Sequence, residues 1–319
     1  MGKIKMPSAR KLEQDFTLER AFDAFVKSSA ARGLAEKTLQ TYQSHFKCVE
    51  RHLDGSLPLC SLTQQHLERA ILSMRESGLS PNSICSYVRV MTTFFHWCQK
   101  QGYSQLTMPQ YKGVETFKEP YTDEELLLLL KKPKANCRFS EYRTWVVINF
   151  CLNAGCRAAT IRHILNKDVD FSQNQVFFRH TKSGKIQVIP LCSKMALILR
   201  EYMAIRGGAD DEYLFCDECG GQLSENALKL SIAHYNHARG VAKTSTHLFR
   251  HTFARKYLLD CGGDAFTLQK LLGHSTLHMT RHYCRIYDAD LSENFDALSP
   301  LAQLKTSPSR IAMPRRKQK

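Results

Sequence analysis

Residues 247–252 read His-Leu-Phe-Arg-His-Thr, residues 271–275 read Leu-Leu-Gly-His-Ser, and residues 280–283 read Thr-Arg-His-Tyr. Four of these side chains carry chemistry, namely His247, Arg250, His274 and Tyr283. A permanent cation, two imidazoles and a phenol without a carboxylate form a poor set of metal ligands. The same groups suit attack on a phosphodiester, because a guanidinium pairs with phosphate oxygens and a phenol can act as a nucleophile.

The spacing places these side chains on helices. His247 and Arg250 lie three apart on a helix expected from Thr246 to Leu259, so they share one face. Good N-cap residues precede this helix at positions 244–246, which puts both side chains where free N–H groups and the helix dipole favour an anion. Tyr283 is expected to project from a further helix after His274. A phenol with a pKa of about 10 needs a base or positive potential nearby.

A second guanidinium can supply part of that potential. Arg157 follows the small-residue sequence Asn-Ala-Gly-Cys at positions 153–156, which allows the backbone to approach a ligand closely. Arginine stays charged and presents paired donors that fit two phosphate oxygens at once. We therefore expect Arg157 and Arg250 to act on the same phosphate.

Composition points to a globular protein with a polyanionic partner. The 319 residues are 43% hydrophobic, and the net charge of +15 comes from 45 Lys and Arg against 30 Asp and Glu. Nucleic acid is the leading partner, and a basic enzyme without a polyanion is the alternative. The 12 cysteines are expected to be reduced, because residues 1–14 lack the apolar run of a signal peptide. No apolar stretch approaches the ~20 residues of a membrane span, so a cytoplasmic protein is expected.

The chain is expected to be mainly α-helical with a small antiparallel β-sheet. Apolar residues at helical spacing predict a four-helix domain over residues 15–103, and Pro and Gly residues mark a linker over 104–120. A capping box at 122–125 opens a second domain that extends to residue 290. Within it, residues 175–191 are typical of a β-hairpin with a Ser-Gly turn. Residues 291–319 are expected to form a docking segment and a basic tail.

Two patterns raise the question of a metal. Cys216 and Cys219 have half of the spacing of a zinc ribbon, but the chain contains no second Cys-x-x-Cys pair. His247 and His251 stand four apart, as do His278 and His282, yet the glutamate of a His-Glu-x-x-His motif is absent. We therefore expect neither a metal nor another cofactor.

Taken together, these motifs resemble those of the tyrosine recombinase, or phage integrase, family. The resemblance covers about residues 15–290, and the first domain resembles the helical, SAM-like core-binding module of the family. It is similar to the two-domain, Xer-like and mobile-element members, because residues 1–14 are too few for an additional arm-binding domain. The matching positions are Gly155-Cys156-Arg157, Lys182 in the hairpin turn, His247 to His251, Leu272-Gly273-His274, and Tyr283.

The resemblance implies a role for each of these residues. Tyr283 would attack the scissile phosphate and form a 3′-phosphotyrosyl link, while Arg157 and Arg250 hold the non-bridging oxygens. Lys182 would protonate the leaving 5′-oxygen. His247 would assist proton transfer at the tyrosine, and His274 would donate a hydrogen bond to the phosphate. The bond energy stays in the phosphotyrosine, so neither ATP nor a metal is needed.

Several alternatives remain open at this stage. Lys185 competes with Lys182, Tyr287 competes with Tyr283, and Thr160 stands where many relatives carry an acidic residue that orients the site. The resemblance implies that two protomers clamp one duplex and that two such dimers form a tetrameric synapse, with residues 295–304 docking on a neighbour. Integration and excision of a mobile element is the expected use. The rival functions are those of a type IB topoisomerase and of a DNA-binding regulator that does not cut.

Overall fold

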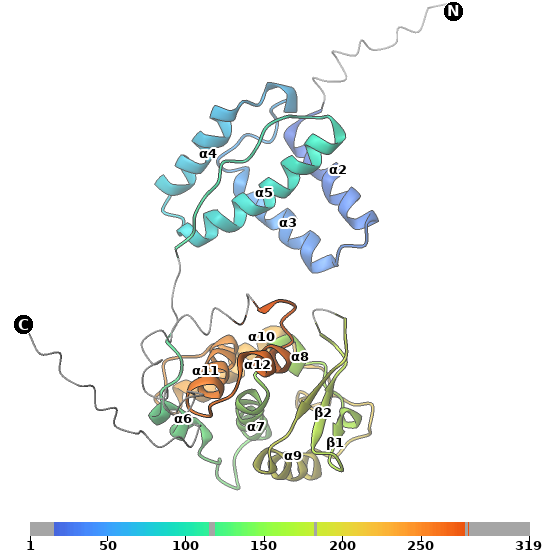
Figure 1. The fold of residues 1–319 in the computed structure, drawn as a ribbon, viewed down its shortest axis with the longest axis vertical. Helices are drawn as coiled ribbons and strands as arrows, with labels where there is room; N and C mark the ends of the chain where they lie inside the picture. Colours follow the sequence, from blue (N-terminus) through green and yellow to red (C-terminus); the bar gives the residue numbers. More distant parts are fainter. Residues whose placement is uncertain (1–15, 115–118, 182–183, 278–279, 281–319) are drawn as a thin grey trace, which may run out of the picture. The chain divides into compact units, whose positions relative to one another are not determined.

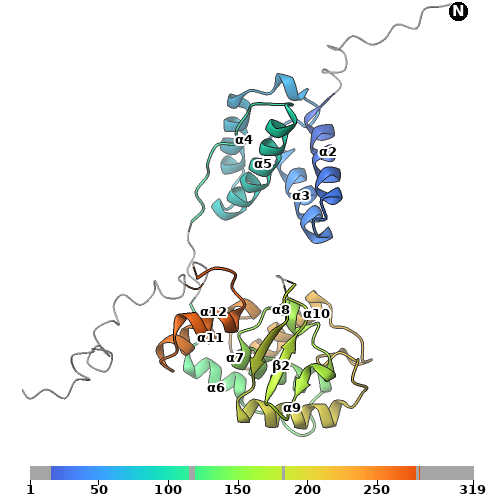
Figure 2. The same ribbon diagram turned by 45° about the vertical axis from the view of Figure 1, so that its right-hand side comes forward.

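The computed structural model describes residues 16–114, 119–181, 184–277 and Thr280. The chain divides into two compact units, Met1–Phe117 and Lys118–Lys319, and each has its own apolar core (Figures 1 and 2). The described part is mostly helical and contains a three-stranded antiparallel sheet. The predicted fold class is thereby confirmed.

Helices pack around aromatic rings in the first unit. The ring centroid of Phe22 lies 5.5 Å from that of Phe25 and 5.3 Å from that of Phe94, and all three side chains are buried. Ser80 caps the last of these helices by accepting from the backbone N–H of Ser83 at 3.2 Å, as its Ser-Pro sequence predicts. The elements are α2 (Leu18–Ala31), α3 (Glu36–Val49), η1 (Leu59–Ser61), α4 (Gln64–Glu76) and α5 (Pro81–Gln101).

The segment after α5 packs against the first unit. Met108 is buried in its core, and Leu106 and Tyr111 pack against the same cluster. Residues 104–111, which the sequence assigned to the linker, therefore contribute apolar surface to the helical unit.

A central helix, α7 (Phe139–Ala154), organises the second unit. Residues 142–151 of this helix are all buried, as expected for a helix that is surrounded by other elements. Figures 1 and 2 show α7 between the sheet on one side and α11 and α12 on the other. The surrounding helices are α6 (Asp123–Leu130), α9 (Ser193–Arg206), α10 (Glu225–His237), α11 (Thr246–Leu259) and α12 (Ala265–Leu272).

The sheet follows two short helical segments, α8 (Ala158–Ile161) and η2 (Asn166–Asp168). Its strands are β1 (Val169–Asp170), β2 (Gln175–Phe178) and β3 (Gln187–Pro190), paired in that order. β2 and β3 form the predicted hairpin, in which Val176 pairs with Ile189, whereas the two-residue strand β1 was not predicted. Val176, Phe178 and Ile189 point into the core of the unit. None of the described helices is long and apolar enough to cross a bilayer.

Candidate active site

Arg250 is a buried arginine near the start of α11, and only 4% of its surface is exposed. Its Nη1 donates to the carbonyl oxygen of Gly155 at 2.8 Å, and its Nη2 donates to the carbonyl oxygen of Leu272 at 2.8 Å. Carbonyl oxygens are neutral acceptors, so these two bonds fix the guanidinium without cancelling its charge. The result is an oriented cation where the ends of α7 and α12 meet α11.

Gly155 makes this arrangement possible. It is the C-cap of α7 and has a left-handed conformation with φ of 55°. A Cβ atom at this position would lie 2.3 Å from Cδ1 of Phe253 and 2.9 Å from Cδ2 of Leu272, so glycine is required on both counts. The sequence suggested that the small residues at 153–156 admit a ligand. The structure shows instead that Gly155 admits α11 and α12 and presents its carbonyl to Arg250.

Arg157 lies two residues beyond Gly155, at the N-cap of α8, and is half-buried. Its positive charge is one of the causes that lower the pKa of His274, after burial and Arg250. Arg157 is therefore close enough to His274 for its charge to act on the imidazole. Thr160, which replaces the acidic residue of many relatives, is buried in α8.

His274 follows Gly273, the left-handed C-cap of α12 with φ of 61°. Its Nε2 lies 2.7 Å from Nη2 of Arg250, and its Nδ1 lies 2.9 Å from Oγ1 of Thr280. Because a guanidinium can only donate, Nε2 accepts and Nδ1 carries the ring proton. Burial, followed by the charges of Arg250 and Arg157, lowers the pKa of His274 to about 4. The ring is therefore neutral at physiological pH.

His247 is exposed on α11, three residues before Arg250. Ser245 is the N-cap of this helix, within the predicted capping residues, but its side chain makes no capping hydrogen bond. His247 therefore lies at the surface, close in sequence to a buried cation and beside the positive end of the helix dipole.

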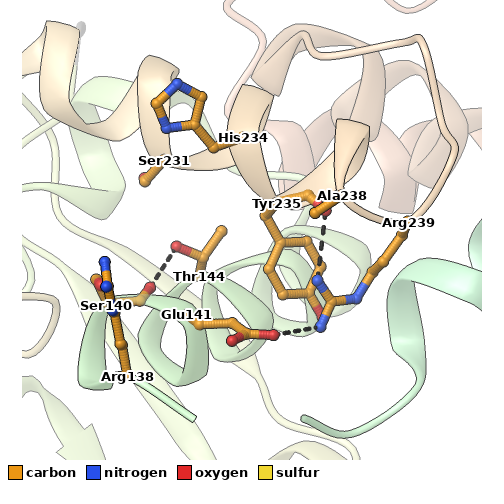
Figure 3. A pocket seen from close by; sticks show the side chains of 9 residues that line it. All are labelled: Arg138, Ser140, Glu141, Thr144, Ser231, His234, Tyr235, Ala238 and Arg239. Carbon is orange, nitrogen blue, oxygen red and sulfur yellow. Dashed lines mark hydrogen bonds and ion pairs between the residues drawn. The ribbon is translucent and has the colours of Figure 1, made fainter.

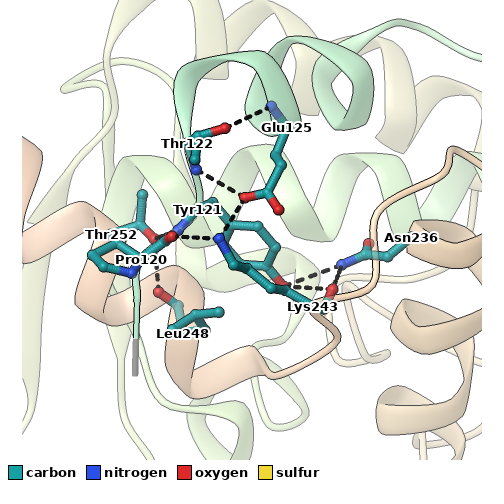
Figure 4. A network of polar contacts seen from close by, with 8 residues as sticks. All are labelled: Pro120, Tyr121, Thr122, Glu125, Asn236, Lys243, Leu248 and Thr252. Carbon is teal, nitrogen blue, oxygen red and sulfur yellow. Dashed lines mark hydrogen bonds and ion pairs between the residues drawn. The ribbon is translucent and has the colours of Figure 1, made fainter. Parts of the chain in front are cut away.

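A network of polar contacts fastens α11 to the start of α6 (Figure 4). Thr252 of α11 accepts a hydrogen bond from the backbone N–H of Tyr121 at 3.0 Å, although 131 positions separate the two. Asn236 donates to the carbonyl oxygen of Lys243 at 2.6 Å, and Nζ of Lys243 lies 2.9 Å from Oε2 of Glu125. Burial would raise the pKa of Glu125, but hydrogen bonds from Lys243 and from the backbone lower it. This ionic anchor helps to set the orientation of α11.

Two of the six predicted site residues, Lys182 and Tyr283, lie outside the described residues. Tyr287 and the segment 291–319, which contains the expected docking positions, lie outside them as well. Lys185, the alternative to Lys182, is described and is exposed on the hairpin.

A pocket of the second unit lies between α7 and α10, away from Arg250 (Figure 3). None of the four described site residues lines it. Nη2 of Arg239 donates to Oε1 of Glu141 at 2.8 Å, and the same guanidinium lies 3.5 Å from the centroid of the Tyr235 ring. These contacts satisfy the charged groups mutually and join the two helices.

Within the described part of the chain, no three His, Cys, Asp or Glu side chains gather closely enough to hold a metal ion. Around the Cys-x-x-Cys sequence, the carboxylate of Asp217 accepts from the N–H groups of Cys219 and Gly221, each at 2.8 Å. Cys216 is buried while Cys219 is exposed. These residues form a hydrogen-bonded turn.

The geometry therefore joins Arg250 to a neutral His274, and the charge of Arg157 acts on the same imidazole. Such a site binds an oxyanion and stabilises negative charge that develops on it. The sequence pattern of the phage integrase family matches residues 121–290, more than half of the chain. The chain belongs to the phage integrase family. It is a tyrosine-type, site-specific DNA recombinase.

Curated relatives match this recombinase over most of their length. It is 23% identical to the tyrosine recombinase XerC of Chromobacterium violaceum over 299 residues, which cover 91% of this chain and 98% of the relative. It is 27% identical to a tyrosine recombinase of Pseudothermotoga lettingae over 281 residues, which cover 85% and 94% of the two chains.

Solved structures show the same fold. A lambda integrase dimer bound to a COC′ core site matches with a TM-score of 0.69 at 20% identity, covering 83% of this chain and 97% of that one. The Tn1549 transposon integrase in complex with transposon right end DNA matches with a TM-score of 0.70 at 19% identity, covering 87% and 99%.

Sequence reasoning missed the residues that support the recombinase site. The carbonyl oxygens of Gly155 and Leu272 accept hydrogen bonds from Arg250, and the hydroxyl of Thr280 accepts one from Nδ1 of His274. Backbone acceptors leave no trace in residue type. Thr280 lies in the same short stretch as Tyr283, but the sequence assigned no role to its hydroxyl.

Proposed function

We propose that the phenolic oxygen of Tyr283 attacks the scissile phosphorus while Arg157 and Arg250 hold the non-bridging oxygens. A bond forms between this oxygen and phosphorus, and the bond to the 5′-oxygen breaks, which leaves a 3′-phosphotyrosine and a free 5′-hydroxyl. The reverse attack by the 5′-hydroxyl of a second strand rejoins the DNA and releases the tyrosine. The bond energy is conserved throughout, so the reaction needs no ATP and no metal.

The remaining roles concern protons. Lys182, or Lys185 in its place, protonates the 5′-oxygen as it leaves, and His247 assists proton transfer at the phenol of Tyr283. His274 first orients Arg250, because its Nε2 accepts a hydrogen bond from Nη2 of Arg250 at 2.7 Å. When Nη2 turns to a phosphate oxygen, the ring takes the Nε2–H form and donates to the phosphate. The hydroxyl of Thr280 then donates to Nδ1, because a hydroxyl can act in either sense.

One observation carries this proposal: Arg250 is buried, and neutral carbonyl oxygens at the ends of α7 and α12 orient it beside a neutral His274. A guanidinium oriented in this way can present paired donors to an anion. In a water-poor site it acts more strongly on the charge that gathers at phosphorus in the transition state.

A covalent trapping experiment tests the proposal. Nicked suicide DNA that carries the recognition site should form a denaturant-resistant complex with the full chain, and peptide mapping should place the DNA on Tyr283. Tyr283→Phe should abolish the complex, and the matched control Tyr287→Phe should retain it. Binding without any covalent complex would favour a regulator. Relaxation of any supercoiled plasmid without a recognition site would favour a type IB topoisomerase.

The Arg250 side chain provides a second discriminating variant. Arg250→Lys keeps a positive charge but cannot bond both carbonyls and a phosphate in the planar geometry of a guanidinium. We expect it to lower the cleavage rate by about 100-fold or more while DNA binding changes little, because one missing donor to a developing oxyanion costs roughly 10² to 10³ in rate. Cleavage at the wild-type rate would contradict the assigned role.

Double-stranded DNA is the proposed partner, bound by two protomers at each site and by four in the synapse. The net charge of +15 supports a polyanionic partner. A solved structure of lambda integrase is described as a tetramer bound to a Holliday junction, and its chain matches this one with a TM-score of 0.71 at 19% identity, covering 88% of this chain and 81% of that one. Sedimentation of the recombinase on one site and on paired sites measures both states.

Integration and excision of a mobile element is the proposed use, with resolution of joined chromosomes as a second candidate. The second candidate draws support from the XerC of Chromobacterium violaceum, which matches over 98% of its length. Deleting the gene distinguishes these two uses. Disappearance of one excised, circular DNA element from the cells supports the first use, whereas chains of cells with unseparated chromosomes support the second.

A further inference from the structure

The end of the β2–β3 hairpin is fastened to both sides of the arginine site. On the β3 side, Gln187 is the first residue of the strand. Its Nε2 donates to the carbonyl oxygens of Lys270 and Leu271, each at 2.7 Å, at the C-terminal end of α12. A Cβ atom on Gly273 would lie 2.7 Å from Oε1 of Gln187, so this glycine leaves room for the amide. One side chain thus joins the hairpin to the helix end that precedes His274.

On the β2 side, His180 stacks on His163. The ring centroids lie 3.9 Å apart and the ring planes are tilted by 17°. Nδ1 of His163 lies 2.7 Å from the carbonyl oxygen of Ala159, which can only accept, so this nitrogen carries the proton and the ring is fixed to α8. Since α8 begins directly after Arg157, the stack joins the hairpin to the segment that carries the half-buried arginine.

The β2 arm is also held beside the stack, at Arg179. Asp168 has only 1% of its surface exposed. Its carboxylate accepts from Nε of Arg179 at 2.6 Å and from the backbone N–H of Leu165 at 2.9 Å. At the turn itself, Oγ1 of Thr181 donates to the carbonyl oxygen of Lys185 at 2.7 Å. His180 and Gln187 are therefore the described side chains that reach from the two arms of the hairpin towards α8 and α12.

We infer that His163, His180 and Gln187 are positioning residues that hold the two arms of the β2–β3 hairpin against the arginine site. The inference rests on the proposed role of the turn lysine as proton donor to the leaving 5′-oxygen. Proton transfer requires contact within hydrogen-bond reach, and a displacement of about 1 Å lowers such a rate by up to 100-fold. The two ties lie on opposite arms of the hairpin, one to α8 and one to α12, so together they restrain the position of its arms.

A sulfur-substituted substrate isolates this step. When sulfur replaces the bridging 5′-oxygen, the leaving group is a thiolate whose conjugate acid has a pKa near 8.5, so it departs without being protonated. A positioning defect at the turn lysine should therefore slow cleavage of ordinary DNA and spare the sulfur substrate. A general loss of structure would slow both substrates alike.

The variants are His180→Ala and Gln187→Glu, with His180→Phe as the conservative replacement that keeps a stacked ring. Gln187→Glu is nearly isosteric but places a carboxylate against two carbonyl oxygens, which removes the donated hydrogen bonds. The controls are His237→Ala and Gln173→Ala, both at exposed positions of the same unit. All are measured as single-turnover covalent-complex formation by the full chain on both substrates.

We expect His180→Ala and Gln187→Glu to lower the rate on ordinary DNA by roughly 10- to 100-fold and to stay within about threefold of the wild type on the sulfur substrate. His180→Phe should recover most of the loss. Equal slowing on both substrates, or wild-type rates on ordinary DNA, would overturn the inference. Should His180→Ala unfold the unit, Gln187→Glu decides by the same comparison. If the wild type forms no covalent complex on either substrate, the proposed function itself has failed.

Discussion

The buried imidazole of His274 makes the stability of the second unit depend on pH. Its pKa is lowered from 6.5 to about 4, first by burial and then by the charges of Arg250 and Arg157. One pKa unit corresponds to about 1.4 kcal/mol. Protonating this ring in the folded chain therefore costs about 3 kcal/mol more than protonating it in the unfolded chain, a large share of the 5 to 15 kcal/mol that stabilises a typical domain.

The sign of the effect follows from proton binding. Between pH 6.5 and 4 the unfolded chain carries a proton on His274 and the folded chain does not. Acid therefore favours unfolding in this window. The contribution is complete above pH 6.5, declines as the pH falls, and is lost below pH 4.

Urea unfolding at a series of pH values measures this contribution. The reference is His274→Gln, whose amide can accept from Arg250 and donate to Thr280 but does not titrate. Between pH 7 and 4 the wild type should lose about 3 kcal/mol more stability than His274→Gln, whereas His237→Gln should follow the wild type. Parallel curves for the wild type and His274→Gln, or a His274 pKa above 6 in an NMR titration, would refute the reasoning.

Three further predictions follow from the site and its supports. Gly155→Ala should lower the free energy of unfolding by about 2 to 5 kcal/mol, because a left-handed alanine is strained and its Cβ meets Phe253 at 2.3 Å; chemical denaturation with a loss below about 1 kcal/mol would contradict this. Lys243→Met should cost about 1 to 3 kcal/mol by the same assay, because Glu125 loses its ionic partner, and Lys243→Arg should cost less. Covalent-complex formation should be unchanged in excess EDTA, and loss of the reaction would reveal a required metal.

Local structure in this chain could be predicted from the sequence where a few neighbouring residues determine it. The Ser-Pro start of α5, the capping box of α6 and the pairing of β2 with β3 all depend on neighbours that are close in sequence. Their physics is contained in a short window of sequence. Strand β1 was missed because two residues are too few to show an alternating pattern.

The assembly of the site could not be predicted as well from the sequence. Its hydrogen bonds join distant positions, and several of the acceptors are backbone carbonyl oxygens, which every residue has. Arg250 was identified by its motif, yet its acceptor at Gly155 is a backbone oxygen 95 positions away. The ties at His163 and Gln187 likewise depend on which loops the fold brings together. Gly155 before Arg157 indicated a close approach to the backbone, but the sequence did not show that α11 and α12 are the elements that approach.

Two helix ends contribute partial negative charge around the guanidinium of Arg250. The carbonyl of Leu272 lies at the C-terminus of α12, and that of Gly155 follows the last residue of α7, where aligned peptide dipoles place partial negative charge. Each end carries roughly half of a negative charge, so the two ends together stabilise the buried guanidinium and orient it. Gly155 and Gly273 end these helices in the left-handed conformation, and Gly155 itself supplies one of the two acceptor oxygens, so the backbone geometry that ends α7 also orients Arg250.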